Sequence, residues 1–393
     1  MLPFTVAIFT SAFLVFQVQP VIARFILPWY GGTPGVWTTC MLFFQLGLLA
    51  GYLYAHGLAK CLQLKHQAMV HGCLLALSLF LLPITPALPE SPGSFPQTLE
   101  ILKILAIAVC FPFILLSASA PLLQHWFANV HPGKSPYRLY ALSNVGSLLA
   151  LLSYPFLVEP ALTLSTQTRT WSFAYLAFMA MTLWCAWPVL AQKLNQNPKQ
   201  PAVETKTRAR KSKRLTPVKA PSWFDRVTWM LLAACGSVVL LAVTNQMCRD
   251  VAVIPFLWVV PLSLYLITFI ICFERDTWYQ RKIWIPFLAI GVGVLVYLLG
   301  RDFADTELSL AYQIMIYCAA MFGCCMVCHG EMVRRRPAAG DLTLFYVYVA
   351  LGGALGGIFV NLIAPLLFDG FWELHGSLVF VCLLAILFVA LDH

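Results

Sequence analysis

Twelve long runs of mostly apolar residues are the feature that most constrains this chain. Each has roughly 17–25 residues, which is enough to cross a bilayer as a helix. The runs are continuous and do not alternate, so they predict helices and not barrel strands. The expected spans are 3–23, 36–56, 68–84, 99–118, 138–157, 170–190, 227–243, 252–273, 283–299, 308–328, 342–366 and 375–391.

The overall composition agrees with a membrane protein. Hydrophobic residues make up 60% of the chain, charged residues only 10%, and the mean hydropathy is +0.80. A soluble chain of this length needs far more charge to cover its surface. The first run has no basic segment before it and no small-residue cleavage site, so we interpret it as a membrane helix and not as a removable signal. The 13 cysteines show no framework spacing and are interpreted as buried free thiols.

A basic segment, residues 193–220, divides the chain into a first membrane half at 1–192 and a second at 221–393. It is rich in Lys, Arg and Pro and has too few large apolar residues to fold alone. Much of the net charge of +9 comes from this linker. Such a charge is typical of cytoplasmic loops of membrane proteins, so we expect no nucleic-acid partner and expect the lipid bilayer as the main one.

The distribution of positive charge predicts the orientation. With the N-terminus in the cytoplasm, 20 of the 25 Lys and Arg residues fall on the inside and five on the outside. Every inside loop then carries more positive charge than its neighbours, as expected for inner-membrane proteins. The sequence therefore predicts a multi-pass protein of a bacterial inner membrane with both termini in the cytoplasm.

A weak internal repeat links the fifth and eleventh spans. An offset of 210 residues places Gly146 on Gly356, Pro155 on Pro365 and Glu159 on Asp369. Two six-helix halves in the same orientation, joined by a basic linker, are the plan of the major facilitator fold. The predicted fold class is thus an all-α integral membrane protein of about 12 helices in two halves.

Polar side chains within apolar runs are candidates for a substrate path. Gln17, Gln19, Asn144 and Asn361 are the ones we assign to it. Pro20 frees carbonyl groups in the turn that precedes it, which favours Gln17 and Gln19. The alternative is that each amide only joins neighbouring helices by hydrogen bonds. Glycine-rich stretches, among them Gly356, are expected to lie where helices pack closely.

Charged groups near the ends of the spans suggest two further sites. Glu159, Asp250, Asp369 and Glu373 fall on the outer side, where an acidic vestibule would concentrate cations. His125, His329 and Glu331 fall at the inner ends of the fourth and tenth spans, where they would form a gate or a docking surface. Solvated loops and interfacial caps look alike in sequence, so both interpretations stay open.

The segment Cys325-Met-Val-Cys328-His329 matches the attachment signal of c-type haem. Its expected place on the cytoplasmic side argues against covalent haem, which is attached on the outer side. A zinc site made from Cys324 and these residues is also disfavoured, because one helical turn cannot supply tetrahedral ligands. We therefore predict no cofactor and no metal.

Enzymatic motifs are absent from the sequence. Neither G-x-G-x-x-G after a strand nor G-x-x-x-x-G-K-[ST] occurs, so no nucleotide site is predicted. The apolar centres contain almost no Asp or Glu, although proton-coupled cation carriers usually keep carboxylates there. Intramembrane catalysis is disfavoured for want of an acid–base or metal cluster.

Several long segments resemble a known family. FLVFQVQPVIARFILPWYGG, SPYRLYALSNVGSLLALLSYPFLVEP, VAVIPFLWVVPLSLYLITFIICFE and LTLFYVYVALGGALGGIFVNLIAPLLF are similar to the membrane portion of bacterial spermidine-synthase-like proteins fused to a major-facilitator-like region. The resemblance implies a membrane unit with a polyamine connection. The aminopropyltransferase half of that family has no counterpart in these 393 residues, so no catalytic residue is carried over.

Two functions follow as hypotheses. The first is a transporter-like unit for a small polar or cationic solute, including a polyamine. The second is a non-transporting subunit that anchors or regulates a soluble enzyme or a larger membrane complex. A polar central cavity would favour transport, and a sealed apolar interior would favour the subunit.

Overall fold

The computed structural model is a bundle of helices, and we found no strand among the residues that it describes. These are residues 1–31, 34–87, 96–191, 220–250, 257–300, 309–370 and 372–392. The side chains of residues 34, 35, 37, 38, 249 and 250 are not described. The predicted linker at 193–220 therefore lies outside the described residues except for its last position.

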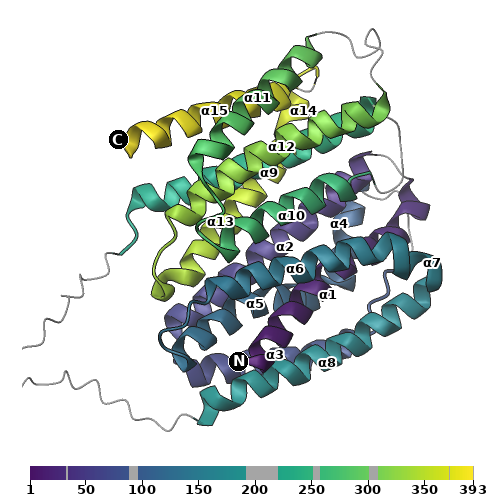
Figure 1. The fold of residues 1–393 in the computed structure, drawn as a ribbon. Helices are drawn as coiled ribbons and strands as arrows, with labels where there is room; N and C mark the ends of the chain where they lie inside the picture. Colours follow the sequence, from purple (N-terminus) through teal and green to yellow (C-terminus); the bar gives the residue numbers. More distant parts are fainter. Residues whose placement is uncertain are drawn as a thin grey trace, which may run out of the picture.

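Helices of the first half occupy one side of the bundle in Figure 1, and those of the second half occupy the other. The first half contains α1 (Leu2–Tyr30), α2 (Pro34–Cys61), α3 (Leu64–Ser78) with the 3₁₀ turn η1 (Leu79–Leu81), α4 (Gln97–Ala108), α5 (Cys110–Val130), α6 (Tyr137–Ser153), α7 (Glu159–Ala161) and α8 (Leu164–Ala191). The second half contains α9 (Trp223–Asp250), α10 (Val259–Glu274), α11 (Arg281–Leu299), α12 (Leu310–Arg334), the 3₁₀ turn η4 (Ala339–Asp341), α13 (Leu342–Ile358), α14 (Ala364–Leu367) and α15 (Trp372–Leu391).

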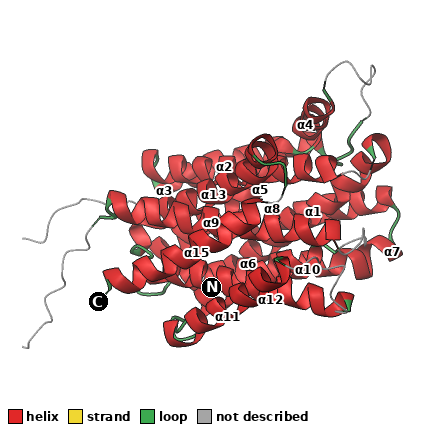
Figure 2. Cartoon of the chain, turned by 90° about the horizontal axis from the view of Figure 1, so that it is seen from above, coloured by secondary structure: helices red, strands yellow, loops and turns green. Residues whose placement is uncertain are grey.

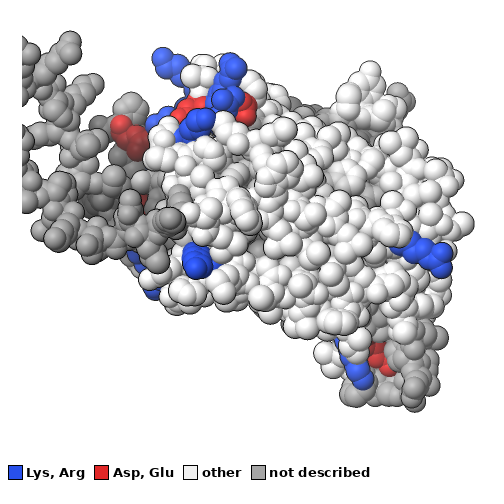
Figure 3. Space-filling view, turned by 90° about the horizontal axis from the view of Figure 1, so that it is seen from below, with Lys and Arg blue, Asp and Glu red and all other residues white. Residues whose placement is uncertain are grey.

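Eleven described helical segments are long and apolar enough to cross a membrane, and α10 is a shorter apolar helix of 16 residues. Together they correspond to the twelve predicted spans. Side chains such as Leu366, Phe156 and Phe173 expose 85%, 73% and 71% of their surface, as expected for residues that face lipid. The face in Figure 3 is a broad area of uncharged residues with charges near its ends. The chain is an all-α integral membrane protein.

The fourth predicted span, 99–118, is placed wrongly. Hydropathy runs on without a break from α4 into α5, but the backbone turns at Val109, whose φ is −137° and ψ is −12°. The membrane-spanning helix is Cys110–Val130, and α4 is a separate 12-residue helix that carries Glu100 and Lys103. Pro112 falls in the first turn of α5, where a missing N–H costs little.

The two halves repeat the same helix contacts. In the first half α1 packs on α6 and α8, and α2 packs on α5; in the second half α9 packs on α13 and α15, and α10 packs on α12. The halves meet through two matching pairs, α6 with α10 and α2 with α13. Figure 1 shows α6 and α10 running side by side at this junction. This duplication is the internal repeat expected from the sequence.

Close helix approaches confirm the predicted role of the glycine-rich stretches. A methyl group at Gly146 would lie 2.7 Å from the carbonyl oxygen of Phe9 on α1. A methyl group at Gly356 would lie 2.7 Å from the carbonyl oxygen of Ala234 on α9, the equivalent first helix of the second half. Both positions therefore require glycine for the helix axes to come this near.

Each repeat also contains one π turn, η2 (Tyr154–Val158) after α6 and η5 (Phe359–Ile363) after α13. The turns lie 205 residues apart, and a proline lies two residues after the end of each, Pro160 and Pro365. At this offset Glu159 corresponds to Ala364 and not to Asp369. A proline removes a backbone donor and crowds the preceding turn, which accounts for the wider turns.

The bundle has two ends. At one end lie the start of α1, the end of α15 and the residues that flank 193–219, and we call it the linker face (Figure 1). At the other end, the distal face, lie Tyr30 and the start of α15. The start of α1 and the end of α15 thus lie at the same face, as an even number of crossings requires.

Candidate functional site

A cavity of ≈ 190 Å³ lies between the two halves, near the middle of the bundle. Helices α1, α2, α5 and α6 of the first half and α9, α10 and α13 of the second contribute to its wall. Its polar lining consists of amides and hydroxyls: Ser11, Gln19, Gln45, Tyr52, Ser117, Tyr140, Ser143, Asn144, Ser147, Ser237 and Tyr265. The cavity wall therefore combines polar groups with apolar side chains and is not wholly apolar.

No Asp, Glu, Lys, Arg or His lines this cavity in the part of the chain that the structure describes. Two of its polar atoms, Gln45 Oε1 and Ser117 Oγ, are buried and have no hydrogen-bond partner. A buried polar atom without a partner costs about 1–3 kcal/mol. Gln45 Oε1 faces Gly357, so a ligand hydroxyl would bond to it only after the amide turned toward the cavity. The described part of the cavity wall thus offers hydrogen-bonding groups but no charged side chain.

Aromatic residues close the cavity toward the linker face. Tyr140 of α6 stacks on Tyr346 of α13 with ring centroids 4.8 Å apart, and Tyr52 of α2 lies 6.2 Å from the same ring. The Tyr346 hydroxyl donates a 2.6 Å hydrogen bond to Gln124 Oε1 of α5. His56 Nδ1 and Thr343 Oγ1 also join the halves, at 3.0 Å. The two halves are thus held together on this side of the cavity.

Polar contacts tie the halves together at the linker face as well. The guanidinium of Arg138 on α6 lies 2.6 Å from Glu274 at the end of α10. The Tyr137 hydroxyl donates a 2.6 Å hydrogen bond to the carbonyl oxygen of Pro337, and Arg336 lies over the Tyr137 ring at 4.8 Å. A conformation in which the central cavity opens toward the linker face would have to break these contacts.

A denser ionic cluster, centred on Glu331, lies within the second half. Glu331 is 1% exposed and accepts hydrogen bonds from Arg281 Nε at 2.6 Å, from the Tyr279 hydroxyl at 2.9 Å and from Arg335. Asp392 lies 2.6 Å from Arg281. Partial burial raises the pKa of Asp392, but the hydrogen bond from Arg281 and the charge of Arg335 hold it below its ordinary value. The cluster joins α11, α12 and the end of α15.

Removal of the central carboxylate should destabilise the fold. Glu331→Ala leaves the guanidinium groups of Arg281 and Arg335, which are 17% and 14% exposed, to share Asp392, so we expect a loss of about 3 kcal/mol. Thermal unfolding followed by tryptophan fluorescence measures it. The control is Glu274→Ala, which breaks a pair whose arginine is 68% exposed and should cost no more than about 1 kcal/mol. Equal midpoints for both variants would contradict this assignment.

The four predicted path residues take different positions. Gln19 and Asn144 line the cavity, and Nε2 of Gln19 donates to the carbonyl oxygen of Val15 at 3.2 Å. Gln17 is buried at 6% exposure but is not part of the cavity wall, and its Oε1 has no partner. Asn361 lies in the π turn η5, outside the wall, and both of its amide atoms are buried without partners.

The predicted acidic vestibule is not gathered into one pocket among the described residues. Glu159 pairs with Arg24 at 2.9 Å, and Asp369 is an exposed residue between α14 and α15. Glu373 is 6% exposed and lines a second, lateral groove. The side chain of Asp250 lies outside the described residues. None of the three described carboxylates belongs to the wall of the central cavity.

The three residues predicted to form an inner gate do not lie together. Glu331 lies in the ionic cluster at the linker face, whereas His125 is half-buried on α5. His329 is fully buried, stacks on Phe269 with centroids 3.7 Å apart and contacts Thr268 Oγ1 at 2.8 Å through Nδ1. It therefore lies behind the aromatic wall of the cavity and not at its entrance.

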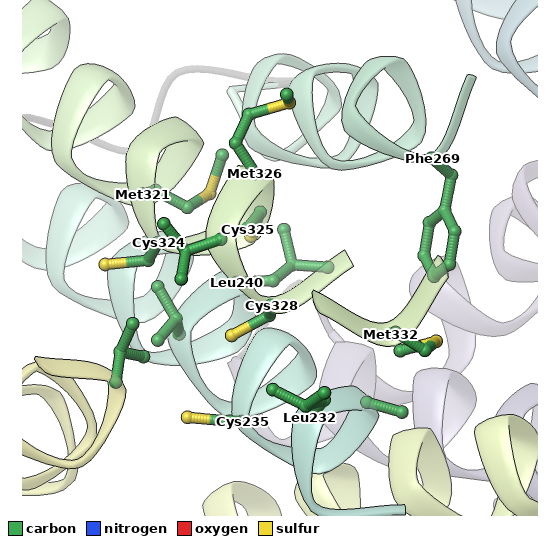
Figure 4. Packing of buried hydrophobic residues seen from close by; sticks show 14 of the residues in the cluster. Leu232, Cys235, Leu240, Phe269, Met321, Cys324, Cys325, Met326, Cys328 and Met332 are labelled. Carbon is green, nitrogen blue, oxygen red and sulfur yellow. The ribbon is translucent and has the colours of Figure 1, made fainter. Parts of the chain in front are cut away.

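The C-x-x-C-H segment is part of a sulfur-rich core. Cys325 and Cys328 are 0% and 1% exposed, and Figure 4 shows them with Cys235, Met321 and Met332 between α9 and α12. Within the described ranges, no group of three His, Cys, Asp or Glu side chains is placed to hold a metal ion. That no haem is attached here stays a prediction.

The four residues that the sequence assigned to the path do not include Gln45, Ser117 or the three lining tyrosines. Gln45 lies directly against Gly357, which has no side chain to displace it. An amide facing a glycine on another helix is a signal of this site, but the pairing is visible only once α2 and α13 are known to touch.

Comparison with known proteins shows the fold. No family model and no curated protein matches the chain. Among solved structures it is similar to XylE, a major facilitator superfamily proton:xylose symporter bound to 6-bromo-6-deoxy-D-glucose, with 13% identity and a TM-score of 0.55 over 99% of this chain and 95% of that one. A double-tryptophan mutant of XylE gives 13% identity and a TM-score of 0.56, over 98% and 94% of the two chains.

The chain is thus a multi-pass membrane protein with a major-facilitator-like fold, as the sequence predicted. The two halves, their repeated helix contacts and the cavity between them are those expected of that architecture.

Proposed function

We propose that the central cavity binds a small, uncharged polar solute and that the chain carries this solute across the bilayer. The observation that carries the proposal is the cavity wall, which offers amides and hydroxyls from both halves and no charged side chain in the described residues. Its volume of ≈ 190 Å³ is below the roughly 300–1,000 Å³ of drug-sized pockets, which favours a small ligand.

Movement of the two halves against each other is the mechanism that this arrangement supports. The substrate would sit where both halves contribute hydrogen bonds, and access would alternate between the two faces as the halves rock. The tyrosines that join α2, α6 and α13 close the linker side in this conformation. The other conformation would have to separate Tyr346 from Gln124 and Arg138 from Glu274.

A cationic substrate has less support. A polyamine would bring two or more positive charges into a cavity without a carboxylate, and an uncompensated charge in such a site is costly. The polyamine connection rests on the resemblance to spermidine-synthase-like proteins alone. A non-transporting subunit that anchors or regulates a soluble enzyme or a larger membrane complex stays the alternative. Residues 193–220, one of its expected docking surfaces, lie almost entirely outside the described ones.

A binding panel tests the choice of substrate. A ligand that binds only the folded state raises the midpoint of thermal unfolding. XylE, a structural neighbour, is named for an aldose, so D-xylose and D-glucose are the first neutral probes, with glycerol, putrescine and spermidine beside them. We expect at least one neutral polyhydroxy compound to stabilise the protein and spermidine to have no effect. Stabilisation by the amines alone would overturn the proposal in favour of cation transport.

We propose further that the linker face is cytoplasmic and that the membrane is a bacterial inner membrane. The support is the 20-to-five division of Lys and Arg between the two sides. Reporter fusions after position 393 and within 193–219 should both show a cytoplasmic signal, and a fusion in the segment between α14 and α15 should show the opposite one. A periplasmic signal at either of the first two positions would contradict this orientation.

A further inference from the structure

A second hollow, which we call the lateral groove, lies on the outside of the second half. It measures ≈ 320 Å³ and is formed by α9, the segment from η5 to Phe368, and the first half of α15. Its rim includes Trp372 and Phe380, which are 62% and 42% exposed. Because these side chains lie on the apolar outer surface, the groove opens toward lipid and not toward the central cavity.

One carboxylate stands in this apolar groove. Glu373 lines it and is 6% exposed. Among the described residues, no other residue donates a hydrogen bond to it and no Lys or Arg pairs with it. Ser377, the nearest hydroxyl along the same helix, instead donates to the carbonyl oxygen of Leu374 at 2.8 Å. The carboxylate accepts a hydrogen bond from its own backbone N–H and lies close enough to His375 to interact with it. One backbone donor leaves most of the acceptor sites of a carboxylate unused, so the groove has room for a further donor.

The depth of the groove matches one leaflet. Glu373 lies in the first turn of α15, beside Trp372, a residue type that favours the membrane–water interface. Phe380 lies seven positions beyond Glu373 along the helix, about 10 Å deeper at 1.5 Å per residue. Half of the hydrocarbon core is roughly 15 Å thick. The groove thus runs from headgroup depth toward the middle of the bilayer.

We propose that the lateral groove binds a membrane lipid whose headgroup carries a primary ammonium, such as phosphatidylethanolamine. The ammonium donates charge-assisted hydrogen bonds to Glu373, and one acyl chain lies along Gly376 and Phe380 against α9. A choline headgroup has the charge but no N–H donor. A glycerol headgroup on an anionic phosphate would place like charges together. The proposal is independent of the solute in the central cavity.

Native mass spectrometry of the purified protein tests this site directly. Phosphatidylethanolamine, phosphatidylcholine and phosphatidylglycerol with the same acyl chains are titrated in turn. We expect one tightly retained phosphatidylethanolamine, half-saturated at an about tenfold lower concentration than the other two lipids. Glu373→Gln should remove this preference and bring all three lipids to the same value.

A second variant fills the groove without touching the carboxylate. Gly376 lies on the wall, and a methyl group there would meet nothing within 4 Å, so Gly376→Phe should fold and should lose the retained lipid. Gly293→Phe on α11 is the matched control, since Gly293 is exposed and also has open space around it. Equal retention of the three lipids by the parent, or an unchanged preference in Glu373→Gln or Gly376→Phe, would overturn the proposal.

Discussion

Gly352→Leu is expected to lower the midpoint of thermal unfolding by at least about 5 °C and to reduce the yield of folded protein. A methyl group at Gly352 would overlap the carbonyl oxygen of Met230 and would lie 2.8 Å from the Ala233 side chain. A backbone carbonyl on a packed helix cannot turn aside, so α13 and α9 would have to separate. Overpacking costs about 1–3 kcal/mol where side chains give way, and more where backbones must.

The neighbouring glycine is the matched control for this effect. Gly353 lies on the same helix and lines the cavity, and a methyl group there would meet nothing within 4 Å. Gly353→Leu should therefore keep a midpoint close to that of the parent. If both variants unfold at the parent's temperature, α13 does not pack on α9 as the structure has it.

The same Gly353→Leu variant should lose most of its transport activity while it stays folded. Its isobutyl group would occupy part of a cavity of only ≈ 190 Å³. Asn144→Leu and Gln19→Leu should also reduce solute uptake, each by about tenfold or more, because a hydroxyl brought against an alkyl group loses its hydrogen bond. Initial uptake rates in proteoliposomes, normalised to the amount of folded protein, measure these effects.

Gln17→Leu provides the control for the amide variants. Gln17 lies two positions from Gln19 on α1, is buried outside the cavity wall and has an unpaired Oε1. Replacement of an unsatisfied polar group by an apolar one of similar size is nearly neutral or stabilising. This variant should transport at the parent's rate. A loss equal to that of Gln19→Leu would mean that the substrate path runs along a different face of α1.

Hydropathy predicted the number of spans and the two halves, because a membrane helix can be identified in a sequence from its length and apolar content. It misplaced the fourth span, because α4 and α5 are continuous in hydropathy and only the backbone at Val109 separates them. The sequence matched Pro155 with Pro365 at an offset of 210 residues, whereas the two π turns lie 205 residues apart.

The candidate site was harder to predict, for a physical reason. A membrane helix is apolar on the faces that touch lipid and on those that touch other helices, so the pattern does not show which side faces the cavity. Gln17 and Gln19 therefore looked equivalent, and only Gln19 lines the wall. The acidic residues looked like one group because they share a side of the membrane, yet Glu159 is paired with Arg24 and Glu373 faces a different groove.

Uptake of labelled neutral solute into proteoliposomes is the most direct test of the central cavity as a transport site. Parent protein and Gly353→Leu are reconstituted at equal amounts, with protein-free liposomes as the blank, and D-xylose, D-glucose and glycerol are offered with spermidine. We expect saturable uptake of at least one neutral solute by the parent, uptake near the blank by Gly353→Leu, and no uptake of spermidine by either protein. Equal uptake by the two proteins, or uptake of spermidine alone, would contradict this expectation.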